Sequence, residues 1–293
     1  MIVSVSRRCD IPRFQFDWFM EKLNAGFTDV ANPYNAGQIK CVSLAPEDVD
    51  AFVFWTRNPR HILANADELT QRGFPFYVMV SVTGYPVALE PNMTPASEVL
   101  LSMKELSQLL QRSKKMGQER VIWRYDPVIL TSITDEDFHR RNFNDIAQKL
   151  AGSVKRVIIS IYDDYQGAKK RLEKLEKAGQ LRMINTKDAD NGKGIHGLLS
   201  DFAKSAEAAG MEIQSCAEKE DFSLFGIKPG ACIDAALIEK MRSAFRGASG
   251  DAPCNEVPRT RDKNQRPNCL CCKSVDIGAY NTCPARCVYC YAS

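Results

Sequence analysis

Short apolar runs rich in β-branched residues alternate along this chain with longer segments that repeat apolar residues every three and four positions. The first pattern predicts buried strands and the second predicts amphipathic helices. The expected strands are Ile2–Val5, Ala51–Trp55, Phe76–Val82, Arg120–Trp123, Arg156–Ile161 and Glu212–Ser215. The expected helices are Phe16–Leu23, Ala96–Lys115, Asp135–Leu150, Ala168–Ala178, Leu198–Ala209 and Ala235–Phe245.

Strands that alternate with helices in this way form a parallel sheet in an α/β fold. The number of units favours a full or partial (β/α) barrel of the TIM type, and no G-x-G-x-x-G run follows the first strand. An open doubly wound sheet is the alternative. Phe27–Leu44 carries turn residues between apolar flanks, which predicts a hairpin before the second barrel strand.

The pattern changes at Gly247, after which Gly, Pro, Asn, Arg and Cys dominate. We therefore divide the 293 residues into a barrel domain, 1–246, and a cysteine-rich iron–sulfur-binding extension, 247–293, packed on the barrel mouth. Seven of the 11 cysteines follow residue 253. In a reducing compartment such thiols serve metals or redox chemistry rather than disulfides.

Charge and hydropathy give little support to nucleic-acid binding and to a membrane span. The formal net charge is only +3, without the basic stripe that nucleic-acid binding usually needs. No apolar run reaches the roughly 18 residues of a membrane span, and the first residues enter a strand pattern without a signal-peptide arrangement. We expect a cytoplasmic protein with no membrane partner.

The C-terminal residues contain a C-x-x-x-C-x-x-C run formed by Cys283, Cys287 and Cys290, with Tyr289 before the last cysteine. Three thiolates from one loop suit three irons of a four-iron cubane and leave the fourth iron open. The run resembles the signature of the radical S-adenosylmethionine (SAM) superfamily. The resemblance implies a 4Fe-4S cluster that reductively cleaves SAM, giving a 5′-deoxyadenosyl radical that acts on an unknown small-molecule substrate, with flavodoxin or ferredoxin as reductant.

The position of the run differs from that superfamily, whose cluster loop follows the first barrel strand. Here the loop closes the chain, so the resemblance implies a circularly permuted barrel in which Met1–Ser6 and Asp276–Tyr280 are neighbours. The Gly-Gly-Glu run that holds SAM in other members is absent from the sequence.

Polar residues follow the expected strands, where a parallel barrel places its binding site. For each one alone, a helix cap or a surface ion pair is an equal explanation, but the set together favours function. By resemblance, Arg7, Arg57 or Arg124 would hold the SAM carboxylate, and Asp126, Glu218 or an Asn would hold the ribose hydroxyls. Tyr289 would pack beside the cluster.

A second group of cysteines lies outside this run. We predict that an auxiliary iron–sulfur cluster is bound by Cys216, Cys232, Cys269 and Cys271. Zinc is the rival, because four thiolates suit it equally well. We treat Cys9, Cys41, Cys254 and Cys272 as ordinary thiols, with Cys9 the least certain because it lies at the expected barrel mouth.

Several stretches resemble the bacterial family called domain of unknown function 1848. They are Ser4–Pro12, Val53–Pro59, Trp123–Pro127 and Asp276–Cys283. The resemblance covers nearly the whole chain and implies radical-SAM-like cluster chemistry without an assigned reaction. It also implies a short stretch beyond Cys290, whereas this sequence ends three residues later.

Other functions are weighed against a radical SAM enzyme. The same cysteines fit a non-enzymatic zinc or iron–sulfur regulatory protein, and a tail that folds alone would suit a zinc ribbon. A nucleic-acid repair enzyme similar to the spore photoproduct lyases is a third alternative, which the low net charge does not favour. The three histidines lack metalloprotease or deaminase spacing, and no G-x-S-x-G run indicates a hydrolase.

Overall fold

The computed structural model describes residues 1–114, 116–187, 194–246, 257 and 259–293. Its centre is a sheet in which every neighbouring pair of strands is parallel, in the order β10-β1-β4-β5-β6-β7-β8-β9. The strands are β1 (Ile2–Val5), β4 (Ala51–Thr56), β5 (Phe76–Ser81), β6 (Val121–Val128), β7 (Arg156–Ile161), β8 (Glu212–Cys216), β9 (Lys228–Gly230) and β10 (Val275–Asp276).

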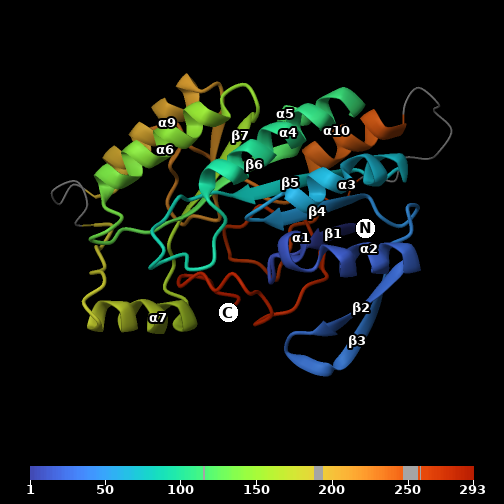
Figure 1. The fold of residues 1–293 in the computed structure, drawn as a ribbon, viewed down its shortest axis with the longest axis horizontal. Coiled ribbons are helices and arrows are strands. Elements are labelled where there is room, and N and C mark those ends of the chain that lie inside the picture. The colour runs from blue at the N-terminus through green and yellow to red at the C-terminus, as the bar shows by residue number, and fades with distance from the viewer. Residues whose placement is uncertain (115, 188–193, 247–256, 258) are drawn as a thin grey trace.

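Helices connect these strands (Figure 1). They are α1 (Ile11–Phe14), α2 (Phe16–Ala25), α3 (Arg60–Gln71), α4 (Ala96–Lys114), α5 (Gly117–Arg120), α6 (Glu136–Leu150), α7 (Gln166–Lys177), α9 (His196–Ala208) and α10 (Ala235–Arg246). A separate antiparallel hairpin consists of β2 (Phe27–Asn32) and β3 (Asn35–Ser43). The expected strands, helices and hairpin are confirmed, whereas α1, α3, α5 and β9 were not predicted.

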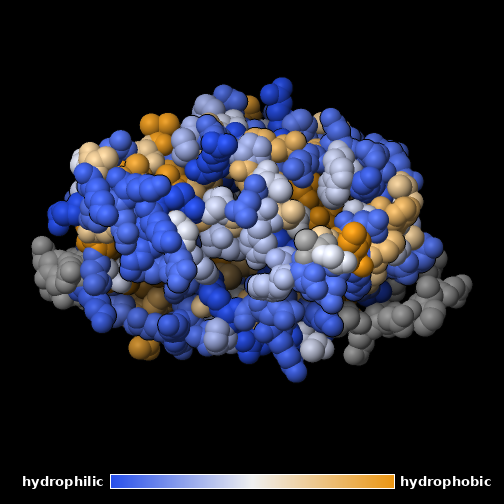
Figure 2. All heavy atoms as spheres, turned by 90° about the horizontal axis from the view of Figure 1, so that it is seen from below, coloured by the Kyte–Doolittle hydropathy of each residue, from blue (hydrophilic) through white to orange (hydrophobic). Residues whose placement is uncertain are grey.

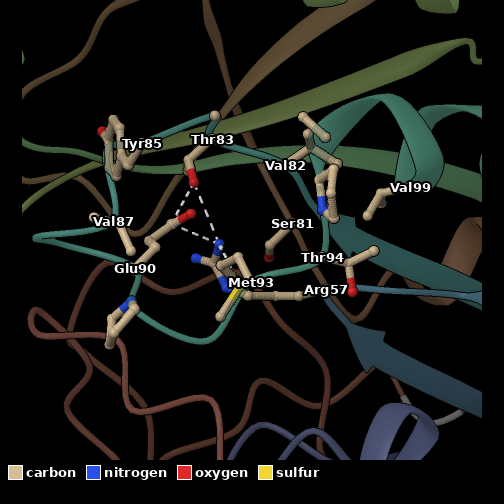
Figure 3. Close-up of a pocket in the computed structure, with 14 residues that line it drawn as sticks. Arg57, Ser81, Val82, Thr83, Tyr85, Val87, Glu90, Met93, Thr94 and Val99 are labelled. Carbon is tan, nitrogen blue, oxygen red and sulfur yellow. Dashed lines mark hydrogen bonds and ion pairs between the residues drawn. The ribbon is translucent and has the colours of Figure 1, made fainter.

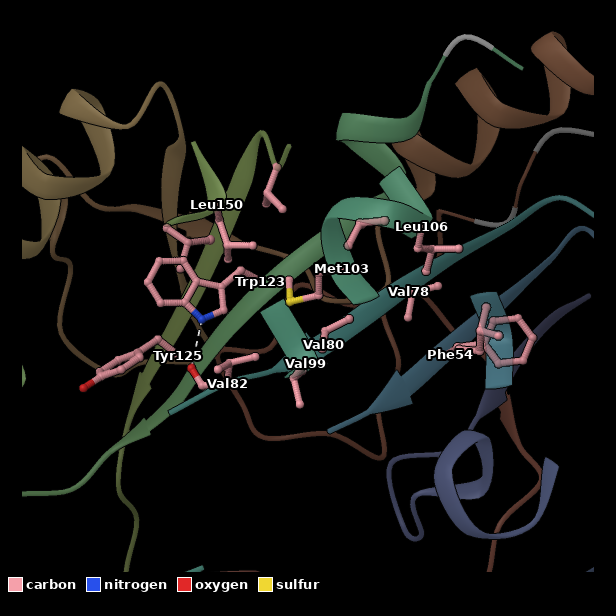
Figure 4. Close-up of a cluster of buried hydrophobic side chains, with 14 of the residues drawn as sticks. Phe54, Val78, Val80, Val82, Val99, Met103, Leu106, Trp123, Tyr125 and Leu150 are labelled. Atoms are coloured by element: carbon pink, nitrogen blue, oxygen red, sulfur yellow. Dashed lines mark hydrogen bonds between the residues drawn. The ribbon is translucent and has the colours of Figure 1, made fainter. Parts of the chain in front are cut away.

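One face of the sheet packs against helices through alternate strand residues, because neighbouring side chains of a strand point to opposite faces. Phe54, Val78, Val80 and Trp123 lie on this outer face with residues of α4 and α6, as Figure 4 shows. The indole N–H of Trp123 donates to the carbonyl of Val82 at 2.9 Å, so this large buried ring leaves no unpaired donor.

The opposite, inner face is closed by α10 and by the cysteine-rich segment. Val53, Trp55 and Tyr77 of the inner face join one buried cluster with residues of α10 and with several cysteines. Arg242 of α10 pairs with Asp50 at 2.9 Å, just before β4 begins, so α10 lies at the amino ends of the strands. The C-terminal segment lies instead at the carboxyl ends of the strands, where Tyr289 contacts Arg57 just after β4.

The two ends of the chain meet in the sheet. β10 pairs with β1 in parallel, with Val3 opposite Val275 and Ser4 opposite Asp276, as expected for Met1–Ser6 and Asp276–Tyr280. Figure 1 shows the C-terminal segment, in red, passing below the strands. Across the described residues β9 and β10 are the two edges of the sheet, so the structure is an α/β fold with a parallel sheet. None of the described helices is long and apolar enough to span a membrane.

Acid should weaken the fold through His139 of α6, which is fully buried. Burial lowers the pKa of His139 to about 4, and its ring bonds the Tyr125 hydroxyl at 2.8 Å and the Ile129 carbonyl at 3.1 Å. The unfolded chain takes up a proton near pH 6.5 and the folded chain does not, so stability should fall as pH drops from about 6.5 towards 4. At about pH 4, His139 should account for a loss of about 3 kcal/mol in the free energy of unfolding, measured with urea.

His139→Asn should flatten the dependence of unfolding free energy on pH between 7 and 5. His61→Asn, at an exposed position, is the matched control and should leave the slope unchanged. Equal slopes in the wild-type protein and His139→Asn would contradict the prediction.

Candidate functional site

The C-terminal cysteine loop follows β10 and is held against the carboxyl side of the sheet. Cys287 is buried, Cys283 and Cys290 are half-buried, and the thiols are close enough for Cys283 and Cys290 each to raise the pKa of Cys287. Burial is the main cause of that shift, to about 11. Arg171 of α7 donates its Nε to the Val288 carbonyl at 2.9 Å and bonds the Cys290 carbonyl. The structure therefore brings together the three cysteines of the predicted motif.

A buried ion pair anchors this loop to the sheet. Arg57, just past β4, donates to the Glu90 carboxylate at 2.7 Å, and the Tyr289 hydroxyl bonds both groups. Thr83 also contacts the Arg57 guanidinium at 3.2 Å. Figure 3 shows Arg57, Thr83 and Glu90 pointing toward one another in the wall of a cavity of about 290 Å³.

The Arg57 charge also acts on the cysteines. Its guanidinium counteracts the burial that raises the pKa of Cys287, because a nearby cation favours the thiolate. Sequence reasoning offered Arg57 as a ligand of the SAM carboxylate. In the structure its donors already serve Glu90, Thr83 and Tyr289, so its place is beneath the cysteine loop.

Cys9 is a fourth thiol at the same loop, which sequence reasoning had treated as spare. It follows β1, the strand beside β10, and its side chain hydrogen-bonds Cys283. That bond lowers the pKa of Cys283 to about 6, and the backbone N–H groups of Asp10 and Ala285 act in the same direction. The signal that could have revealed this contact was the predicted pairing of the first and last strands.

The second cysteine group also comes together. The Cys216 and Cys232 sulfurs lie 3.3 Å apart, and the Cys271 thiol hydrogen-bonds those of Cys232 and Cys269. Among the described residues, no three or more Cys, His, Asp and Glu side chains are arranged as a ready metal cage. Cys272 instead directs its sulfur to the Ile233 carbonyl at 3.3 Å, Cys41 is exposed in the hairpin, and Cys254 lies outside the described residues.

Arg7 and Arg124 interact electrostatically with the second cysteine group and lie against the Trp55 ring, with guanidinium carbons 5.6 and 5.0 Å from its centre. Arg124 pairs with Asp126, whose other oxygen accepts from Ser160 at 2.7 Å. The Arg124 Nε and the Trp55 Nε1 are buried and have no hydrogen-bond partner within the part of the chain that the structure describes. Two unpaired donors on the inner face provide polar contacts that a ligand can satisfy.

Glu218 lies near the second cysteine group, two residues after Cys216. One of its oxygens accepts from the Ile161 N–H at 3.0 Å, and burial raises its pKa to about 7. It lines a second cavity of about 250 Å³ together with Asp163 and Arg266. The face of the molecule in Figure 2 is largely hydrophilic.

Separating Arg57 from Glu90 should be costly because it leaves a buried charge without its partner. Glu90→Leu should lower the unfolding free energy in urea by about 3 kcal/mol or more. Arg57→Met with Glu90→Leu should lose less than the sum of the two single variants, which a double-mutant cycle measures.

The exposed Lys149–Asp145 pair is the control, and Asp145→Ala should change stability by no more than about 0.5 kcal/mol. Additive effects of the Arg57 and Glu90 variants would show that the buried pair is not coupled.

Comparison with known proteins adds one match. A family model described as domain of unknown function (DUF1848) covers residues 2–292. No curated protein and no solved structure matches the chain. The match includes both the sheet and the C-terminal cysteine loop.

Proposed function

The chain belongs to the DUF1848 family, and we propose that it is a radical SAM enzyme with a permuted partial (β/α) barrel. Cys283, Cys287 and Cys290 would bind three irons of a 4Fe-4S cluster, with the fourth iron left for SAM. The observation that carries the proposal is the place of the loop. It follows β10, and β10 lies parallel to β1 at the edge of the sheet. In radical SAM barrels the cluster loop follows the first strand, so β10 would take that strand's place.

The donor set fits such a cluster. Three thiols in one loop, close enough to influence one another's pKa values, are the ligands that iron prefers in cubanes. When bound, a cluster with an open iron supplies the one-electron reductive cleavage of SAM to methionine and a 5′-deoxyadenosyl radical. We further propose that the substrate of that radical binds on the inner face of the sheet, and the unpaired donors at Trp55 and Arg124 support this location.

The residues around the loop have distinct parts in this proposal. Arg57 provides buried positive charge beside Cys287 and offsets the negative charge of thiolates in a site of low dielectric. Tyr289 and Arg171 fix the loop, which limits the entry of water. Arg124 is the best placed of the three predicted arginines to hold a carboxylate, because its Nε is unpaired. Asp126 and Glu218 remain candidates for ribose hydroxyls.

The test is anaerobic reconstitution with iron and sulfide, followed by electron paramagnetic resonance of the reduced protein. We expect a cluster signal that SAM perturbs, and loss of that signal in a Cys283→Ala, Cys287→Ala, Cys290→Ala triple variant. Cys41→Ala, which changes an exposed thiol of the hairpin, is the matched control. A cluster that SAM does not affect would sink the enzyme proposal.

A second candidate function rests on the Cys9–Cys283 contact. If Cys9 binds the fourth iron, the cluster is fully ligated by protein, and the chain is an electron-transfer or regulatory protein. Cys9→Ala separates the two candidates. The enzyme proposal expects SAM to perturb the cluster signal in both the wild-type protein and this variant. A cluster fully ligated by protein would respond to SAM in the variant but not in the wild-type protein.

A further inference from the structure

Four buried thiols from three separate segments meet on the inner face of the sheet, apart from the C-terminal loop. Cys216 ends β8, Cys232 follows β9, and Cys269 and Cys271 lie shortly before β10. We propose that these four cysteines bind a single tetrahedral divalent ion, Zn²⁺, which holds the cysteine-rich segment onto the sheet. This inference does not depend on SAM chemistry at the C-terminal loop.

The spacing of the sulfurs favours one ion over a cluster. In a tetrahedral zinc site with Zn–S bonds of 2.3 Å, neighbouring sulfurs lie about 3.8 Å apart. The Cys216 and Cys232 sulfurs are 3.3 Å apart, so they need to separate by only about half an ångström to bind one ion. In a four-iron cubane each thiolate binds a different iron, and the body of the cluster keeps the sulfurs far apart. Accepting a cubane would require the four thiols to move outward into packed surroundings.

Those surroundings are well packed. Each of the four thiol residues is at most 8% exposed, and they share a buried cluster with Ile233, Trp55 and Met79. Interiors of this density resist the displacement that a larger group would cause. One ion therefore requires smaller displacements of the sulfurs than a cluster does, and a cluster would also require the cysteine-rich segment to shift.

The neighbours of the sulfurs suit metal-bound thiolates. The backbone N–H of Ile233 donates to the Cys271 sulfur at 3.3 Å, an outer-shell contact that stabilises a negatively charged ligand. Arg7 interacts electrostatically with Cys271, and Arg124 does so with Cys216 and Cys232. Four thiolates around a divalent ion have a formal charge of −2, and two nearby guanidinium groups offset it.

The ion would tie together segments that the sheet leaves apart. β8 and β9 are neighbours at one edge of the sheet, whereas β10 is the opposite edge. Contacts of Cys271 and Cys272 with Ile233 already link the segment before β10 to the segment after β9. Because metal affinity adds to folding free energy, removing the ion should loosen β10 and the cysteine loop that follows it.

Cobalt binding tests the site without relying on activity. The Cys283→Ala, Cys287→Ala, Cys290→Ala triple variant should bind one Co²⁺ per chain, with the visible and near-ultraviolet bands of tetrahedral thiolate coordination, and Zn²⁺ should displace it. Adding Cys232→Ala to the triple variant should abolish those bands. Adding Cys272→Ala instead should preserve them, because the Cys272 sulfur points to the Ile233 carbonyl.

Iron counting and X-ray absorption provide tests that need no substitution at the site. Reconstituted wild-type protein should contain about four irons rather than about eight, since only the C-terminal loop takes a cubane. Zinc in the wild-type protein should show four sulfur neighbours at about 2.3 Å and no second metal. Four irons with sulfide in the triple variant would overturn the proposal, and so would a Cys216–Cys232 disulfide in the reduced, metal-loaded chain.

These results separate this inference from the proposed function. Loss of the SAM response with cobalt binding intact would overturn only the enzyme proposal. A SAM response together with about eight irons would overturn only the single-ion site.

Discussion

The buried carboxylate of Asp276 joins the two ends of the chain, and the candidate site depends on it. Its oxygens accept from the Ser4 hydroxyl at 2.7 Å, the Arg7 N–H at 2.8 Å and the Gly278 N–H at 3.0 Å, and the Ser6 hydroxyl also bonds it. A buried carboxylate is stable only when its lone pairs are used in this way. The contact fixes β10 beside β1 and sets the direction in which the cysteine loop leaves the sheet.

The two faces of the sheet have separate tasks. The outer face supplies apolar contact for the helices and most of the core. The inner face begins with apolar residues near α10 and ends with Arg7, Arg124 and Asp126 near the cysteines. Alternation along the strands produces this division, because each strand places one set of side chains on each face. The residues of the outer face can therefore stabilise the fold without being part of the candidate site.

Much of the fold follows from local pattern, whereas the contacts of the site do not. The strands around Phe54 and Ile158 have the apolar, β-branched character that makes a buried strand recognisable. Helix α3 was not predicted although Ile62, Ala66 and Leu69 form a helical stripe, because its N-cap residue is Pro59, which has no side-chain acceptor, and its stripe is short. β9 is only three residues long, too short to show a period.

The site depends on pairs far apart in the sequence. Glu90 lies in the segment after β5, and nothing near it indicates Arg57 or Tyr289 as its partners. The Cys9–Cys283 contact likewise joins the two ends of the chain. The cysteine groups could be proposed because thiols are rare and chemically distinctive, but the ion pair beneath them consists of common residues. Only the packed fold identifies such partners.

The position of β10 has a consequence for the order of biosynthesis. Domains form from the amino end as the chain emerges from the ribosome. One of the two sheet neighbours of β1 is β10, which is translated after β4 through β9. β1 therefore cannot pair on that side until those strands have been made. The Asp276 carboxylate, which accepts hydrogen bonds from Ser4 and Ser6, is therefore made late, and the cysteine loop reaches its position only on a sheet that is already built. The contacts that position the cysteine loop would then form after those of the sheet core.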